Sequence, residues 1–407
     1  MRSLVGLSAL LLFPAALLAD LGLAAVGGWW RPAPVAWVAM GIAGLALLSL
    51  IVAPLRRSIA RNAVGIWIAC VVTLVSLTLS EIALRSWLPW VGFHRRLPRT
   101  IYRFDPSPWA MPGVSQPAEM VINSEGLRGH DSPETRQDYR IVCVGGGTTE
   151  CLYLDDSETW PALLSKGLRE KLPAPVSVDS AGYSGYASRE HARFVERSDL
   201  LNQIDCLVIM VGPDDVLQRL VGTIPARPRV TRTRLFSLLV DALGRQSEPG
   251  IVADFHGVSL VQARQQLYQR QRHFDVDQAL ADFESQIRRI IRVAQQRKVR
   301  LVFVAAPVLW DDVLDERAQK VLRYARVLEK PNPDDWVQPR RCRELTDLFN
   351  ERLIVTCREA ECELVDLTFL SAFDLLFHDD IHFNEAGCRE LAAPLVEYFV
   401  RTGLRRK

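Results

Sequence analysis

The first 83 residues carry almost no charge, and this feature constrains the fold of the chain more than any other. Apolar runs occupy residues 4–26, 33–54 and 63–83, and the whole segment contains five arginines, one aspartate and one glutamate as its charged residues. A helix needs about 20 apolar residues to cross a hydrocarbon core of roughly 30 Å. The sequence therefore predicts three transmembrane helices in residues 1–83, with the lipid bilayer as a partner.

The first of these runs has a second interpretation. Arg2 precedes an apolar core, which is also the pattern of a signal peptide. Cleavage of such a peptide would leave the runs at 33–54 and 63–83 in place, so the chain is expected to be a membrane protein in either case. Tryptophans near the ends of the runs fit the headgroup layer of a bilayer.

The side of the membrane on which the rest of the chain lies is less constrained. Arg56, Arg57 and Arg61 share a short loop, where positive charge most strongly favours the inside. This predicts a multi-pass protein whose larger domain is exoplasmic. Seven of the eight cysteines lie in that domain, and an odd number of thiols without obvious pairing instead favours a reducing compartment.

The remainder of the chain is close to electrically neutral. Residues 84–407 hold 44 basic and 45 acidic residues. A nucleic-acid-binding surface needs excess positive charge to release counterions from phosphates, so this class of partner is not expected. Apolar residues persist to the C-terminus, which argues against disorder.

Residues 140–407 show the alternating strand and helix patterns of an α/β domain. Helical patterns with apolar residues on one face alternate with short apolar runs. This alternation predicts a parallel sheet covered by helices on both faces. The predicted strands are Arg140–Val144, Val176–Asp179, Cys206–Val211, Leu301–Ala305 and Glu363–Leu367. Residues 84–139 are expected to form a juxtamembrane connector with little regular structure, and residues 217–275 an insertion beside the sheet.

Four loops that follow the predicted strands contain candidate chemistry, because ligands collect at the carboxyl ends of parallel strands. They are residues 145–150 (GGGTTE), 182–186 (GYSGY), 212–215 (GPDD) and 378–384 (HDDIHFN). The first lacks a Walker lysine, and a tight strand-to-helix turn explains it better than a phosphate site. In the last, His378, Asp379 and His382 suit either a metal or a hydrogen-bonded Asp–His pair, and the absence of a further ligand cluster favours the pair. No metal and no cofactor is expected.

Taken together and in this order, the four loops resemble the SGNH/GDSL hydrolase family of esterases and acyl-transfer enzymes. The resemblance covers roughly residues 120–403 and is strongest in IVCVGGGTTECLYLDDSETWPALL, SAGYSGYASREH and HDDIHFNEAG. The segment of residues 123–129 (NSEGLRG) also looks like the lead-in of membrane-anchored members. The family has a flavodoxin-like, three-layer α/β/α fold, which agrees with the alternating pattern described above.

The resemblance implies a role for individual residues of this chain. Asp379 and His382 stand where the family has its catalytic Asp and His, and Gly185 matches a glycine of the oxyanion hole. Two positions depart from the pattern: Gly147 occupies the place of the nucleophilic serine, and Asp214 that of the oxyanion-hole asparagine. Glycine has no side chain to attack a carbonyl, and an ionised carboxylate repels a developing oxyanion. Only a protonated Asp214, its pKa raised by burial, would donate a hydrogen bond there.

Two hypotheses follow from these substitutions. The first is a membrane-anchored hydrolase-type protein that acts on an acylated glycan or a lipid ester, with Thr148 as a substitute nucleophile or with water activated by His382 and Asp379. Ser184 and Cys151 are further nucleophile candidates, although structural roles fit them better. The second is a pseudoenzyme, a binding or scaffolding domain at the membrane that holds a glycan or acyl ligand. Asp214, Asp379 and His382 together would also form a small acidic site.

Overall fold

A computed structural model describes residues 96, 98–106, 111–115, 117–131, 138–221, 251–256, 272–311, 313–325 and 337–405, together with scattered positions between 62 and 76. From Arg96 onward these residues belong to one compact unit, Trp90–Ala226 with Ser247–Lys407. The predicted spans at 4–26 and 33–54, and nearly all of 63–83, lie outside the described residues. Within the described part, no helix combines the length and apolar character that a membrane crossing requires.

The unit is built on a parallel sheet of five strands in the order β4-β3-β5-β7-β8. Every neighbouring pair in this sheet is parallel. Counted along the chain, the order is 2-1-3-4-5, which is the flavodoxin-like order. The strands are β3 (Tyr139–Gly145), β4 (Val176–Gly182), β5 (Cys206–Val211), β7 (Arg300–Ala305) and β8 (Glu363–Asp366). All five strands predicted from the sequence are therefore confirmed, with ends that differ by at most a few residues.

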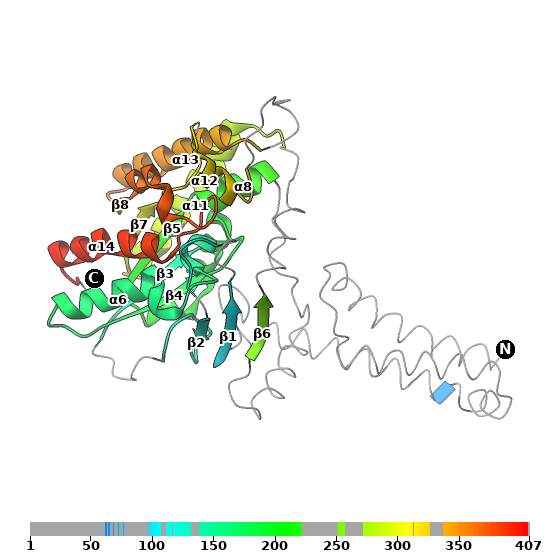
Figure 1. The fold of residues 1–407 in the computed structure, drawn as a ribbon. Coiled ribbons are helices and arrows are strands. Elements are labelled where there is room, and N and C mark those ends of the chain that lie inside the picture. The colour runs from blue at the N-terminus through cyan, green and yellow to red at the C-terminus, as the bar shows by residue number, and fades with distance from the viewer. Residues whose placement is uncertain are drawn as a thin grey trace. The chain divides into compact units, whose positions relative to one another are not determined.

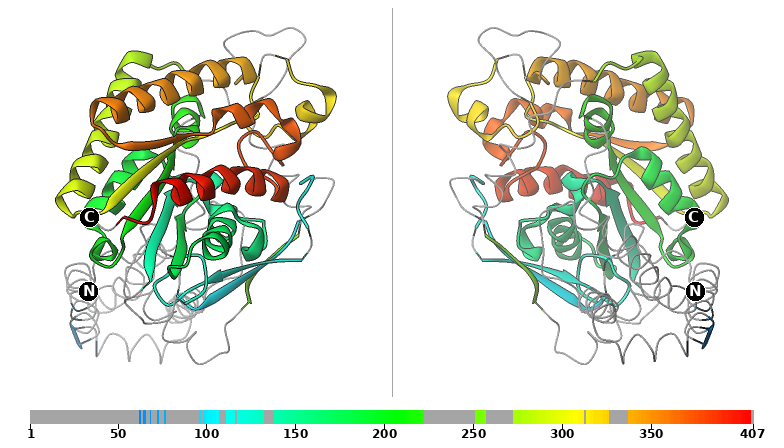
Figure 2. Two further views of the ribbon diagram at one scale, coloured as in Figure 1. Left: turned by 90° about the vertical axis from the view of Figure 1, so that its left-hand side faces the viewer. Right: turned by 90° about the vertical axis from the view of Figure 1, so that its right-hand side faces the viewer.

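Helices cover both faces of this sheet, as the alternating sequence pattern predicts. On one face α14 packs against α6, and on the other α11 packs against α7 and α13 (Figure 1). Figure 2 shows α14, in red, crossing in front of the strands. The long helices are α6 (Trp160–Lys171), α7 (Ser188–Arg197), α8 (Pro213–Val221), α11 (Val276–Gln296), α13 (Pro339–Glu359) and α14 (Glu385–Thr402). Shorter elements are α5 (Gly147–Glu150), α12 (Glu316–Val321), η2 (Asp156–Glu158), η3 (Asp199–Asn202), η4 (Thr368–Ala372) and η5 (Asp374–Leu376).

Side chains fix where several helices begin. The Asp275 carboxylate accepts a hydrogen bond from the N–H of Gln278 at 3.0 Å and caps α11. The side chain of Asn384 caps α14, where it accepts a hydrogen bond from the N–H of Gly387 at 3.0 Å. Such caps satisfy backbone donors that the first turn leaves unpaired. The cap at Asn384 places α14 directly after the loop that carries His382.

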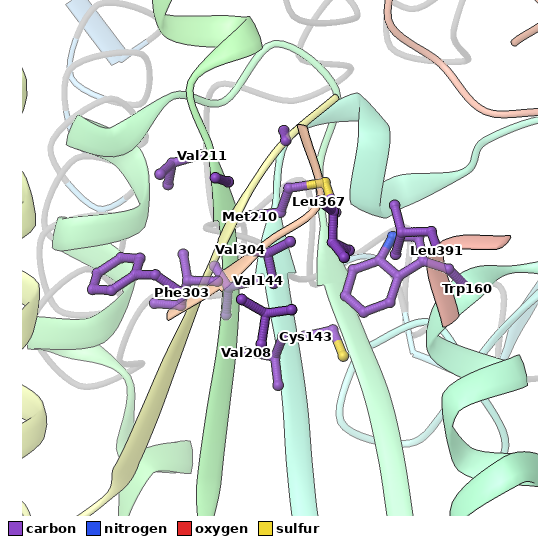
Figure 3. Packing of buried hydrophobic residues seen from close by; sticks show 14 of the residues in the cluster. Cys143, Val144, Trp160, Val208, Met210, Val211, Phe303, Val304, Leu367 and Leu391 are labelled. Atoms are coloured by element: carbon purple, nitrogen blue, oxygen red, sulfur yellow. The ribbon is translucent and has the colours of Figure 1, made fainter. Parts of the chain in front are cut away.

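The core lies between the sheet and its helices. Every residue of β5 and β7 is buried, because strands covered on both faces have no solvent-facing side. Figure 3 shows Val208 and Met210 of β5 beside Phe303 and Val304 of β7, with Trp160 of α6 nearby. Each such side chain contributes on the order of 1.5–3 kcal/mol when it leaves water. The core therefore holds the carboxyl ends of the strands in fixed positions.

A second sheet corrects the expectation for the connector and adds a strand within the expected insertion. Strands β1 (Thr100–Asp105) and β2 (Ala118–Ile122) pair antiparallel, and β6 (Ile251–His256) pairs parallel to β1. The connector of residues 84–139 was expected to have little regular structure, and that is wrong for these two strands, which bury Phe104, Met120 and Ile122 in a small core of their own. Residues 217–221 of the expected insertion complete α8, while 222–250 and 257–271 lie outside the described residues.

Candidate active site

The candidate residues gather at the carboxyl edge of the five-stranded sheet. Gly147 begins α5 directly after β3, Gly185 follows β4, and Asp214 stands in the first turn of α8 after β5. Asp379 and His382 lie in the loop between η5 and α14. The carboxyl ends of neighbouring parallel strands meet at one edge, which is why loops far apart in the sequence converge here.

Asp379 and His382 form a hydrogen-bonded pair. Nδ1 of His382 lies 2.8 Å from Oδ2 and 2.9 Å from Oδ1 of Asp379. The backbone N–H groups of Ile381 and His382 also donate to Oδ1, at 3.0 and 2.8 Å. This cage fixes the carboxylate and leaves Nε2 of the imidazole to face the site. His382 retains 14% exposure of its side chain, whereas Asp379 is buried.

The charges of this pair support each other. Burial alone would raise the pKa of Asp379, but the neighbouring His382, His378 and Arg323 hold it well below its usual range. Burial likewise tends to lower the pKa of His382, but the hydrogen-bonded Asp379 outweighs burial and the net shift is upward. An anionic Asp379 beside a readily protonated His382 is the electrostatic arrangement that a general base requires.

Gly147 lies directly in front of Nε2. A Cβ atom added to Gly147 would lie less than 3.0 Å from Nε2 of His382, closer than real Cβ contacts come. The imidazole therefore occupies the space in which a side chain at position 147 would begin. The geometry points Nε2 at the residue where the resemblance expects a nucleophile, and that residue has no side chain.

Asp214 fills the place of an oxyanion-hole donor. Its Oδ2 accepts a hydrogen bond from the backbone N–H of Gly147 at 3.3 Å, and the side chain is buried. Burial raises the pKa of Asp214 to about 7, while the charge of His382 and the Gly147 N–H oppose the shift and the neighbouring Asp215 adds to it. Because its pKa is about 7, a fraction of Asp214 is protonated near neutral pH. The protonated carboxyl group can donate a hydrogen bond, as expected from the sequence.

Gly185 takes the backbone conformation that its position requires. Its φ of 80° lies in the left-handed region, where a side chain is disfavoured. The carbonyl of Gly185 accepts from Nε2 of Gln218 at 2.8 Å, which ties the turn to α8. No described residue accepts a hydrogen bond from the Gly185 N–H.

The substitute nucleophiles lie in different surroundings. Thr148 is buried on α5, one residue and therefore about 100° around the helix from Gly147. The hydroxyl of Ser184 donates to the carboxylate of Glu150. Sγ of Cys151 lies 3.8 Å from Sγ of Cys388. The described contacts bring none of the three to His382, and Thr148 stays a prediction.

The His378 ring stacks on that of His382, with centroids 5.7 Å apart. Among the described residues, no group of three or more His, Cys, Asp or Glu side chains is arranged to hold a metal ion.

Sequence reasoning missed two residues of this site. Asp380, next to Asp379, accepts hydrogen bonds from the N–H of Tyr324 and Ala325, both at 2.9 Å, and from that of Arg323. Nη1 of Arg323 lies 3.9 Å from Oδ2 of Asp379. The segment around Arg323 follows no strand directly and matches no motif, so the sequence offered no signal for it.

Residues 142–389 match the GDSL-like Lipase/Acylhydrolase family, well over half of the chain. The chain belongs to this family. Gly147, Gly185, Asp214 and the Asp379–His382 pair all lie within the matched residues.

Solved structures of similar proteins share low sequence identity with the chain. The α/β hydrolase LAE5 from the metagenome of Lake Arreo is 15% identical, with a TM-score of 0.39, and the match covers 66% of this chain and 96% of that one. The acetylxylan esterase Axe2 of Geobacillus stearothermophilus is 12% identical, with a TM-score of 0.39 and coverage of 67% and 100%. A protein from Desulfitobacterium hafniense named as a putative lipolytic protein of the G-D-S-L family is 11% identical, with a TM-score of 0.37 and coverage of 64% and 99%. No curated protein matches the chain.

Proposed function

We propose that this GDSL-family domain binds an acyl- or ester-bearing ligand at the site around His382 and does not form an acyl-enzyme intermediate. One observation carries the proposal: the backbone N–H of Gly147 is bonded to the Asp214 carboxyl group, at the position from which a serine would attack and an oxyanion would be held. The nucleophile position at Gly147 and the oxyanion position at Asp214, which covalent ester chemistry needs, therefore both differ from the family pattern and lie in contact with one another.

The missing nucleophile is the first reason. Covalent catalysis requires an oxygen or sulfur atom within reach of the general base, and Gly147 supplies neither. The His382 imidazole has taken the adjacent space, so a substrate carbonyl meets a base without a nucleophile. Loss of the nucleophile alone lowers turnover by about 10⁶ in a serine hydrolase.

The altered oxyanion site is the second reason. Above its pKa of about 7, Asp214 is an anion at a position where negative charge develops during ester hydrolysis. Loss of one oxyanion donor costs about 10²–10³ in turnover, and a fixed anion adds repulsion. The charge of His382 favours the anionic form of Asp214, and Asp214 in turn contributes to the raised pKa of His382.

Hydrolysis by activated water is the second candidate function, and two observations favour it. The His382–Asp379 pair is intact and the pKa of His382 is raised. A protonated Asp214 would in addition donate to an oxyanion. Such an enzyme would place water on Nε2 and transfer its proton to His382 as the water oxygen attacks the ester carbonyl. The tetrahedral intermediate would then collapse with cleavage of the ester bond, and His382 would return the proton to the departing alkoxide, so that an acid and an alcohol are released. Attack on the ester by the Thr148 hydroxyl is the other hydrolytic mechanism that the sequence predicts.

Turnover of p-nitrophenyl acetate distinguishes these functions. We expect wild type to release p-nitrophenol no faster than the His382→Ala variant. His130→Ala is the matched control because His130 is exposed and remote in sequence from the site. We expect the double variant Gly147→Ser with Asp214→Asn, in which the His382 ring must shift to admit the new Cβ, to gain turnover that depends on His382. Wild-type turnover that His382→Ala abolishes and His130→Ala leaves unchanged would establish hydrolysis instead.

We propose that the apolar N-terminal segment anchors this domain to a membrane, with an acylated glycan or a lipid ester as the ligand and with the domain exoplasmic. The proposal rests on the three charge-poor runs at 4–26, 33–54 and 63–83. Cell fractionation tests the anchoring, because deletion of residues 1–83 is expected to move the protein from the membrane fraction to the soluble fraction. Protease accessibility in intact cells tests the side, and protection of the domain until permeabilisation would reverse the orientation.

A further inference from the structure

Arg323 places a guanidinium group beside the His382–Asp379 pair, and no residue that the structure describes accepts a hydrogen bond from it. Its Nη1 lies 3.9 Å from Oδ2 of Asp379, which is the same oxygen that Nδ1 of His382 contacts at 2.8 Å. The side chain is only 20% exposed. Its Nε atom is buried, and within the described part of the chain it has no hydrogen-bond partner. A guanidinium group carries five N–H donors, so most of its capacity is unused.

Other buried or largely buried arginines of the described residues have hydrogen-bond acceptors. Each donates to carboxylates or to backbone carbonyls in its surroundings. They are Arg96, Arg128 and Arg300, which are buried, and Arg140, whose side chain is 15% exposed. Leaving a buried charged donor without a partner is costly, and such groups in folded proteins have a reason such as a bound ion or ligand. Arg323 departs from this rule at the edge of the candidate site.

The position of Arg323 is built by the same loop that builds the site. Asp380 accepts backbone hydrogen bonds from Arg323 and from the two residues that follow it. Nε1 of Trp310 donates to Oδ1 of the same carboxylate at 2.8 Å, the oxygen that the N–H of Ala325 also contacts, and Trp310 is fully buried. The guanidinium also lies over the ring of Tyr324, 5.2 Å from its centroid. The loop that orients His382 through Asp379 therefore orients Arg323 through Asp380.

The charges around Asp379 favour the binding of an anion. Two cationic groups, Arg323 and protonated His382, flank this single carboxylate. Burial raises the pKa of Asp214 to about 7, which limits the negative charge that it adds near neutral pH, and four N–H donors already surround the Asp380 carboxyl group. Planar guanidinium donors match the two oxygens of a carboxylate in spacing and direction.

We propose that Arg323 binds a carboxylate of the ligand that occupies the site around His382. The proposal rests on the proposed function, since it names the chemistry of the ligand that such a domain holds. A free acid, or an acyl group that carries an acid, is then preferred over a neutral ester. This distinguishes the site from that of an esterase whose substrate is uncharged.

Binding of acetate and its neutral analogue acetamide to the purified full-length protein tests this inference, with calorimetric titration as the measurement. We expect wild type to bind acetate saturably and acetamide at least about tenfold more weakly, because a charge-assisted hydrogen bond is lost. Arg323→Gln should weaken acetate binding by a similar factor, and Arg323→Lys should give an intermediate affinity. Arg317→Gln is the matched control, since Arg317 is a partly exposed arginine that pairs with Asp374.

Several results would overturn the inference. They are equal binding of acetate and acetamide, absence of acetate binding by wild type, and an unchanged affinity in Arg323→Gln. Tighter binding of inorganic phosphate than of acetate would show that the anion is a phosphate and not a carboxylate. The comparison of acetate with acetamide uses wild type alone, so a variant that fails to fold does not remove the test. Ester turnover by wild type would refute the proposed function without affecting this charge preference.

Discussion

Replacement of Asp214 by asparagine should change how the stability of the protein depends on pH. Asp214 is buried and its oxygen accepts the Gly147 N–H, and burial raises its pKa from 3.8 to about 7. The folded state therefore holds a proton on this carboxyl group over a pH range in which the unfolded state has released it. Asparagine is similar in shape and does not titrate, so the variant removes this difference.

The sign and size follow from linkage between proton binding and folding. Below pH 3.8 both states are protonated and Asp214 makes no pH-dependent contribution. Between pH 3.8 and 7 the folded state binds more protons, so the free energy of unfolding falls as pH rises, by about 1.4 kcal/mol per unit. The full loss is about 4 kcal/mol. Between pH 5 and pH 8 the stability of Asp214→Asn relative to wild type should therefore increase by about 2.5 kcal/mol.

Urea denaturation of both proteins at pH 5, 6, 7 and 8 measures this difference. Asp131→Asn is the control, because a hydrogen bond from Ser124 lowers the pKa of the exposed Asp131 below its usual value of 3.8. The stability that Asp131 contributes is complete above pH 3.8 and is lost only at more acidic pH, so the difference between this variant and wild type should stay constant from pH 5 to pH 8. A difference between Asp214→Asn and wild type that stays constant from pH 5 to pH 8 would refute the assigned environment of Asp214.

Two further predictions concern the support of the site. Gly182→Ala should destabilise the protein by about 3 kcal/mol or more, because the added Cβ would overlap backbone atoms of Thr149 and Glu150, which cannot move aside. Gly167→Ala is its control: there the Cβ would meet the side chain of Val396, so the cost measured by urea denaturation should be smaller, and equal costs would contradict the reasoning. Trp160→Phe should lower the free energy of unfolding by about 1–3 kcal/mol, because the Thr148 carbonyl loses the indole N–H that donates to it at 3.1 Å. An unchanged urea midpoint in Trp160→Phe would show that this bond does not stabilise the turn.

The parts of the fold that the sequence predicted are those governed by local pattern. Strands β5 and β7 are continuous apolar runs because both of their faces are buried. Such runs can be predicted from the sequence without any information on tertiary structure. Strand β1 was missed because its sequence, TIYRFD, mixes charged and apolar residues and lies in a segment rich in proline and arginine. Its pairing with β2 and β6 depends on chain segments that local pattern does not connect.

The same distinction applies to the site. Asp379 and His382 are three residues apart, so their hydrogen bond follows from a local turn that spacing alone suggests. The bond between Gly147 and Asp214 joins residues 67 positions apart, and only the parallel neighbours β3 and β5 bring them together. Arg323 reaches Asp379 through backbone bonds to Asp380, which no sequence pattern encodes. The motifs therefore pointed to Asp214, Asp379 and His382, but they did not point to Arg323 or to the electrostatic interactions among these residues.

The most direct test of the central claim is the intact mass of the protein after incubation with a fluorophosphonate, which forms a covalent adduct with an activated hydroxyl nucleophile. We expect wild type to remain unmodified, because Gly147 supplies no nucleophile to His382. The double variant Gly147→Ser with Asp214→Asn should gain one adduct at position 147, and His382→Ala in that background should abolish it. An adduct on wild type that maps to Thr148 and depends on His382 would contradict the account and establish a working enzyme with a displaced nucleophile.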